Sequence, residues 1–260
     1  MPLIAKQTVM DKWCCLKLHE ILQRSLERVF FRGKSTKLTA HLTYIIGNVI
    51  LILLFMRLLG VRIPYQWTAG LYPAGFAFHL DFLFGGLEDV IPLVPQMIIF
   101  YLYLFYPMAV LTILYFTFVE YKKGYALGWS LVIINAIAIA IYLVFPVSVY
   151  WWHQEFLTHP IAGNFWAAQV YRLWAFDSYD THSFPSLHAA GSTICFYTWY
   201  QYCKAKPLAT TKLVAIISFI ITVGVILSTI LIKQHYIADE IAGILLAIAV
   251  GRPMFKHLWK

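Results

Sequence analysis

Hydrophobic residues form six long runs along this chain, separated by short polar segments or by segments rich in proline and glycine. An α-helix rises about 1.5 Å per residue, so about 20 apolar residues cross the roughly 30 Å apolar core of a bilayer. The pattern therefore predicts an all-α membrane protein with six transmembrane helices. The six runs cover residues 42–59, 96–119, 125–145, 186–203, 212–232 and 235–250.

The segments outside these runs have patterns of their own. Residues 12–31 alternate charged and apolar positions at helical spacing, which predicts an amphipathic helix in the membrane surface. A solvated helix that docks on the protein itself is the alternative. Residues 60–95 contain many prolines and glycines, which predicts loops with a short interfacial helix. Residues 147–184 are polar and aromatic, and their tryptophans predict a loop that lies against the bilayer.

This division predicts one membrane domain with short flanking segments. Residues 1–40 form a basic, amphipathic N-terminal segment, residues 41–252 a six-span catalytic domain, and residues 253–260 a tail. The composition agrees, because 61% of the residues are hydrophobic and only 12% are charged, against about 25% charged in soluble domains. The net charge of +8 is not organised into a nucleic-acid-binding motif, so nucleic acid is not an expected partner.

The distribution of basic residues predicts the orientation in the membrane. Of the 20 Lys and Arg residues, 16 fall in the N-terminal segment, in the turns after the second and fourth runs, and at the C-terminus. Short cytoplasmic segments of membrane proteins carry such an excess of basic residues. We therefore expect both termini in the cytoplasm. The starts of the fourth and sixth runs then face the periplasm, the cell exterior or an organelle lumen.

Two of the six runs begin with a histidine. His188 opens the fourth run, and His235 opens the sixth with Asp239 four residues later. Residues four apart share a helix face, so the carboxylate can lie beside the His235 ring. A neutral imidazole is a competent nucleophile towards phosphorus, a carboxylate can orient it, and a second histidine can donate and accept the proton. We expect His235 as nucleophile, Asp239 as its orienting group and His188 as acid and base. Ser186 and the amides at the start of the fourth run would bind the phosphate.

These motifs resemble those of the type 2 phosphatidic acid phosphatase (PAP2) superfamily. Residues 184–189, Phe-Pro-Ser-Leu-His-Ala, are similar to its second signature in a PSLH form. Ser228 and Thr229, followed by His235 and Asp239, resemble its third signature, SR-x5-H-x3-D. The resemblance implies a six-span helical bundle and a lipid phosphatase that works through a phosphohistidine without a metal or another cofactor.

Two departures from the superfamily pattern concern the groups that bind the phosphate. Thr229 stands where the superfamily has an arginine, and the Lys-x6-Arg-Pro first signature is absent. In these features the chain resembles the branch of inositol-phosphorylceramide synthases and their bacterial relatives. Other cations must then bind the phosphate, and Arg172, ahead of Lys233, is the best candidate because it can pair bidentately with phosphate. A role for Arg172 as partner of a lipid headgroup or of Asp177 is an equal alternative, and His182 is a further candidate contact.

We expect an integral-membrane phosphatase that hydrolyses a lipid phosphate or diphosphate. The departures keep open a headgroup phosphotransferase that uses an acceptor alcohol instead of water. A non-catalytic lipid transporter or scaffold is a third possibility. A zinc site formed by His182, His188, His235 and Asp239 has suitable ligand types, although the mechanism requires no metal.

Overall fold

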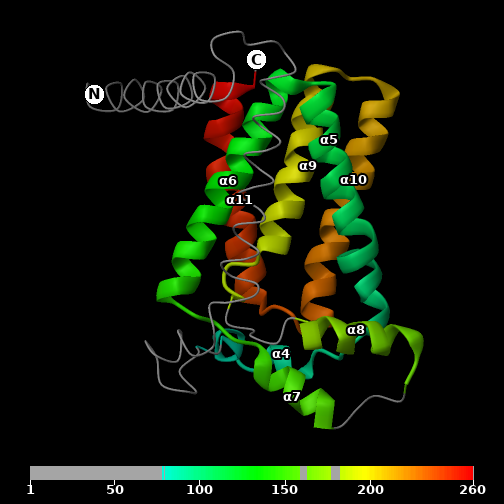
Figure 1. Cartoon of the computed structure of the whole chain (residues 1–260), viewed down its shortest axis with the longest axis vertical. Coiled ribbons are helices and arrows are strands. Elements are labelled where there is room, and N and C mark those ends of the chain that lie inside the picture. Colours follow the sequence, from blue (N-terminus) through cyan, green and yellow to red (C-terminus); the bar gives the residue numbers. More distant parts are fainter. Residues whose placement is uncertain (1–77, 79, 159–162, 177–181, 260) are drawn as a thin grey trace, which may run out of the picture.

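The computed structural model describes residues 78, 80–158, 163–176 and 182–259. Within them the chain is a bundle of long helices with short helices across one end (Figure 1). The predicted first run and N-terminal amphipathic helix lie outside the described residues. The long elements are η3 (Ile99–Phe105), α5 (Tyr106–Phe118), α6 (Tyr121–Val144), α9 (Leu187–Ala205), α10 (Ala209–Leu231) and α11 (Ile237–Leu258). The short ones are η1 (Asp81–Phe84), α4 (Leu87–Val90), η2 (Pro95–Met97), α7 (Tyr150–Thr158) and α8 (Phe165–Phe176).

Four helical segments in the described residues are long and apolar enough to cross a membrane. They are Pro95–Phe118, Lys123–Tyr142, Ala209–Leu231 and Ile237–Leu258. The chain is therefore an integral membrane protein, and four of the six predicted runs correspond to such helices. The last helix continues to Leu258, beyond the end of its hydrophobic run at residue 250. The predicted tail at 253–260 is consequently helical through most of its length.

The remaining long helix, α9, occupies the middle of the bundle. It packs against α5, α6, α10 and α11 (Figure 1). Its buried residues include the polar or small side chains of Ser192, Thr193 and Thr198. A helix that is surrounded by other helices has little surface in contact with lipid, so it can carry more polar side chains. This explains why α9 is less hydrophobic than its neighbours. That α9 crosses the membrane remains a prediction.

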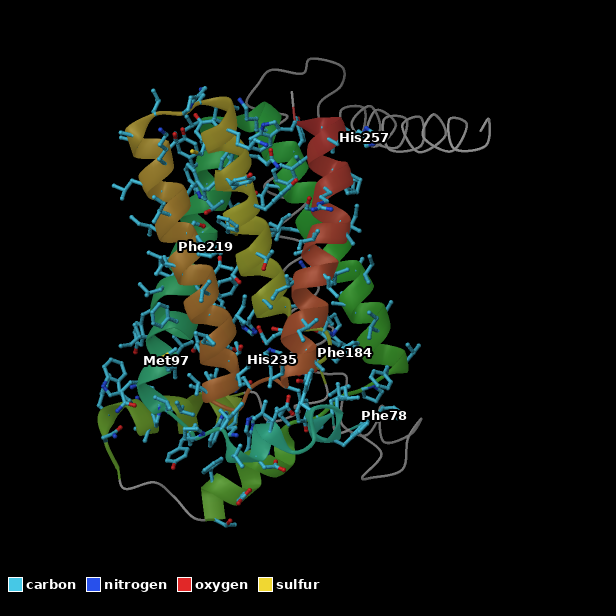
Figure 2. The ribbon with its side chains drawn as sticks, turned by 180° about the vertical axis from the view of Figure 1, so that it is seen from behind. Phe78, Met97, Phe184, Phe219, His235 and His257 are labelled. Atoms are coloured by element: carbon cyan, nitrogen blue, oxygen red, sulfur yellow. The ribbon has the colours of Figure 1, made fainter. Side chains whose placement is uncertain are left out.

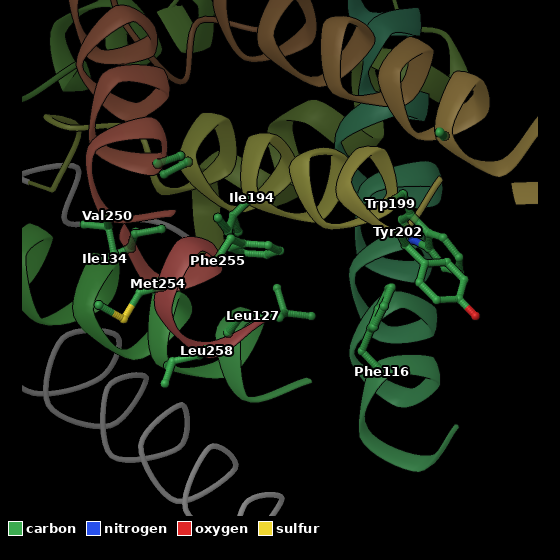
Figure 3. Close-up of a cluster of buried hydrophobic side chains, with 14 residues drawn as sticks. Phe116, Leu127, Ile134, Ile194, Trp199, Tyr202, Val250, Met254, Phe255 and Leu258 are labelled. Atoms are coloured by element: carbon green, nitrogen blue, oxygen red, sulfur yellow. The ribbon is translucent and has the colours of Figure 1, made fainter. Parts of the chain in front are cut away.

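The main hydrophobic core lies at the end of the bundle near the C-terminus of α11. Phe116, Leu127, Ile194 and Phe255 are among its buried members (Figure 3). At this end of the bundle Glu120, in the turn after α5, accepts hydrogen bonds from Lys123 and from Lys206 in the turn after α9, at 2.9 and 2.5 Å. Hydrophobic packing and ion pairs therefore close this end of the bundle. The two histidine motifs lie at the other end (Figure 2).

The opposite end is covered by α4, α7 and α8, which lie across the ends of the long helices (Figure 1). Trp174 of α8 and His153 of α7 stack with ring centroids 4.5 Å apart. The segment 147–184 was predicted as a loop, and the structure instead forms two helices in it. The prediction was wrong because a short helix rich in aromatic residues lacks the long apolar run by which the spans were recognised.

Candidate active site

His235 lies in the turn between α10 and α11. The carbonyl of Thr229 ends α10 by accepting the amides of Gln234 and His235, at 2.8 and 3.2 Å. Tyr236 then caps α11, and its hydroxyl donates to the carbonyl of Ser148 at 2.7 Å. His235 is only 6% exposed. Hydrogen bonds before and after His235 thus fix the conformation of this turn.

Asp239 lies beside the Nδ1 atom of the His235 ring, as the four-residue spacing predicts. Its Oδ2 lies 3.4 Å from Nδ1 of His235 and also accepts the amide of Tyr236 at 2.8 Å. Asp239 is fully buried. A carboxylate in this position fixes the ring orientation and stabilises a positive charge on the imidazole, while Nε2 stays directed away from it.

Ser183 is a member of this group that the sequence analysis did not identify. Its hydroxyl donates to Oδ2 of Asp239 and lies 3.3 Å from Nδ1 of His235. Ser183 is buried and stands in the extended segment before α9, where its amide donates to the carbonyl of Val147. The sequence offered no spacing rule that links this serine to a carboxylate on another helix.

His188 faces the other nitrogen of His235. Its Nδ1 is 3.3 Å from Nε2 of His235, and the ring centroids are 5.6 Å apart. Figure 2 shows His235 at the same end of the bundle as Phe184, far from His257. The structure therefore brings the two histidine motifs together at one end of the bundle. A phosphoryl group that enters between the rings must move them apart from this mutual contact.

The surroundings of His235 favour its protonated form. Burial opposes the charge, but the hydrogen bond to Asp239 and the negative charges of Glu240 and Asp239 raise the pKa of His235 above its ordinary value. His182 is close enough for its own charge to act in the opposite direction. An imidazole that acts as a nucleophile must first lose its proton, so in such a reaction these groups would set the lower pH limit of activity.

The first turn of α9 is locked to the first turn of α11. Ser186 caps α9, because its Oγ accepts the amide of Ala189 at 3.1 Å and its own amide donates to the carbonyl of Asp239 at 3.0 Å. A Cβ on Gly243 would collide with the carbonyl oxygen of Ser186. This close approach sets the separation of His188 and His235. Ser186 is fully buried, so the structure gives its side chain a capping role in place of the predicted contact with phosphate.

Lys233 has contacts that differ from those predicted for a phosphate ligand. Its Nζ donates to the carbonyl of Glu88 at 2.7 Å and lies 4.7 Å from the centre of the Trp152 ring. Its φ of 59° is in the left-handed region, which turns the side chain towards α4 and α7. Burial lowers the pKa of Lys233, against the raising effect of the carboxylates of Asp89, Glu88 and Glu155. Lys233 therefore stabilises the turn that carries His235.

Arg172 and His182 have different surroundings in the structure. Arg172 is exposed on α8, on the opposite side of the helix from the buried Val170 and Trp174. The structure does not bring it together with the two histidines. His182 stands beside Ser183, and its ring centroid is 6.0 Å from that of Tyr142. His182 is thus adjacent to the site, and its contact with a substrate stays a prediction.

The described residues offer no group of three or more His, Cys, Asp or Glu side chains arranged to hold a metal ion. The zinc alternative, which required His182, His188, His235 and Asp239 to converge, therefore finds no support in their geometry. The arrangement instead supplies one oriented imidazole, a second imidazole within reach of the same atom, and a buried carboxylate with its serine. These are the parts of a nucleophile, an acid–base group and an orienting pair.

Comparison with known proteins identifies the family. Residues 73–251 match the family model described as the PAP2 superfamily. No curated protein and no solved structure matches the chain. The match covers more than half of the chain and includes both histidine motifs, so the chain belongs to the PAP2 superfamily.

Proposed function

We propose that the protein is an integral-membrane lipid phosphatase that hydrolyses a lipid phosphate or diphosphate through a phosphohistidine on His235. The observation that carries the proposal is the 3.3 Å approach of the His188 and His235 rings, with Asp239 behind His235. Membership of the PAP2 superfamily supports phosphatase-type chemistry. The location of the site at one end of membrane-spanning helices supports a substrate whose apolar tail stays in the bilayer.

In the first step, the Nε2 lone pair of neutral His235 attacks phosphorus. The bond between phosphorus and the leaving oxygen breaks, and His188 gives its proton to that oxygen. Asp239 and Ser183 hold Nδ1 of His235 while positive charge develops on the ring. In the second step His188 takes a proton from water, the water oxygen attacks phosphorus, and the bond between Nε2 and phosphorus breaks. His188 returns to its protonated form, and inorganic phosphate leaves.

A headgroup phosphotransferase is the second candidate. Thr229 occupies the position of the superfamily arginine and is fully buried, and its hydroxyl donates to the carbonyl of Ile226 at 2.9 Å. The site therefore binds its phosphoryl group with less fixed positive charge than the superfamily signature provides. This difference favours transfer of the phosphoryl group to an acceptor other than water. In the second step an alcohol would then take the place of water.

The distribution of basic residues supports a location of this site on the periplasmic, extracellular or lumenal face, with the termini in the cytoplasm. The test of the function is phosphate release from a panel of detergent-solubilised lipid phosphates and diphosphates, with and without acceptor alcohols. Wild type should release phosphate and His235→Ala should not. Product that contains the acceptor, without free phosphate, would favour the phosphotransferase. Lipid binding without turnover across the panel would favour the transporter or scaffold.

A further inference from the structure

Three aromatic rings from η3 and the first residue of α5 surround His188. The ring centroid of His188 is 4.3 Å from that of Tyr101, 5.6 Å from that of Phe105 and 6.5 Å from that of Tyr106. The segment η3 is a π-helix, in which hydrogen bonds join residues five apart. This winding brings Tyr101 and Tyr106 onto one side, with ring centroids 6.3 Å apart. The π-helix is therefore the reason that all three rings reach the same histidine.

The backbone of α9 leaves room for this contact. Gly191 follows His188 by about one helical turn, and a Cβ there would lie 3.3 Å from the Cζ atom of Phe105. The three rings differ in exposure: Tyr101 is 3% exposed, Phe105 8% and Tyr106 46%. Tyr106 begins α5, in a segment long and apolar enough to cross a membrane, so its exposed side is suited to contact with lipid. The direction from His188 across Tyr106 thus leads from the site to the bilayer.

The first step of the reaction places the leaving alcohol on the side of His188 that faces Tyr106. His188 protonates the leaving oxygen, so the alcohol attached to that oxygen must lie beside the His188 ring. A lipid alcohol must also keep its apolar chain in the bilayer. Val110 and Leu114 follow Tyr106 at intervals of four residues and are 52% and 44% exposed. They continue the apolar face of α5 away from the site.

We propose that Tyr106 is a specificity-determining residue that packs against the lipid alcohol released in the first step, and that the chain of this alcohol follows the Tyr106, Val110 and Leu114 face of α5. The proposal rests on the phosphatase function proposed above, and it adds the position of the leaving group. The phosphoryl group lies between the two histidines, and the lipid departs past Tyr106.

The test compares two probes that differ in their leaving group. Dioctanoyl phosphatidate releases a lipid alcohol, and p-nitrophenyl phosphate releases a small phenol that cannot reach the exposed face of α5. For Tyr106→Ala we expect kcat/KM to fall about tenfold for phosphatidate, with a change of less than twofold for p-nitrophenyl phosphate. Tyr106→Phe keeps the ring and should retain the wild-type ratio between the probes. Tyr103→Ala is the matched control, because Tyr103 is 48% exposed on the same segment.

The outcomes separate the two claims. Equal losses for both probes in Tyr106→Ala, or a ratio that matches Tyr103→Ala, would overturn the role of Tyr106 while the phosphatase function stands. Should Tyr106→Ala fail to fold, Tyr106→Trp enlarges the same ring and must also change the ratio between the probes; an unchanged ratio overturns the role. A wild-type protein that cleaves neither probe nor any lipid phosphate would overturn the proposed function itself, and this inference with it.

Discussion

Ser183→Ala tests the least expected member of the site. The Ser183 hydroxyl donates to Oδ2 of the buried Asp239 and lies 3.3 Å from Nδ1 of His235, so its removal leaves the carboxylate with one donor fewer. A hydrogen bond to a charged group contributes about 1.5–3 kcal/mol. Each 1.36 kcal/mol of transition-state free energy corresponds to about a tenfold change in rate. If the hydroxyl acts mainly in the transition state, kcat/KM should fall roughly 10- to 100-fold.

The assay is phosphate release from a lipid phosphate in mixed micelles, with the thermal unfolding midpoint measured on the same samples. Ser183→Thr keeps a hydroxyl and should retain most of the activity. Ser192→Ala is the matched control, because Ser192 is equally buried on α9 and its hydroxyl donates to the carbonyl of Ala189 at 3.2 Å. Wild-type kcat/KM in Ser183→Ala, with an unchanged unfolding midpoint, would refute the reasoning. So would a loss as large in Ser192→Ala.

Three further predictions follow from the same contacts. Asp239→Asn removes the hydrogen bond and the negative charge that raise the pKa of His235, so the acidic limb of the remaining kcat/KM profile should move to lower pH; an unmoved limb would contradict this assignment. Burial raises the pKa of Glu120, but hydrogen bonds from Lys206, Lys123 and Tyr202 outweigh it and lower the pKa to about 2. Its stabilisation is complete above the ordinary value of 4.5 and lost as pH falls towards 2, so Glu120→Gln should lower the unfolding midpoint at pH 7 while kcat stays at the wild-type value. Gly243→Ala should destabilise the protein by about 1–3 kcal/mol in denaturant titrations, because the new methyl group meets the carbonyl of Ser186; wild-type stability would show that α9 and α11 approach less closely.

The membrane-spanning helices could be predicted because length and apolarity are local properties of a sequence. The runs at 96–119, 125–145 and 212–232 correspond to helices within a few residues, and the run at 235–250 corresponds to a helix that continues to Leu258. The two helices α7 and α8 could not be predicted this way, since their stability comes from packing across the end of the bundle. The stacked rings of His153 and Trp174 are an example.

The same distinction applies to the site. The four-residue spacing of His235 and Asp239 was sufficient to predict their contact, although His235 lies just before α11 and not on it. The contact of Ser183 with Asp239 could not be predicted, because it depends on the path of the chain before α9, which no local sequence pattern specifies. Ser186 was expected to bind phosphate, whereas in the structure it caps α9, a role that serine often takes at the start of a helix. Lys233 stands two residues from His235, but its left-handed backbone turns it towards Glu88.

The central claim is that His235 carries the phosphoryl group between the two steps. The most direct measurement uses His188→Asn, which removes the acid–base group and should slow the second step, incubated with a lipid phosphate labelled with radioactive phosphorus. After rapid denaturation at alkaline pH, where phosphohistidine survives, peptide mapping should find the label on residue 235 and nowhere else. Label on another residue, or none in a variant that still consumes the lipid, would contradict the account.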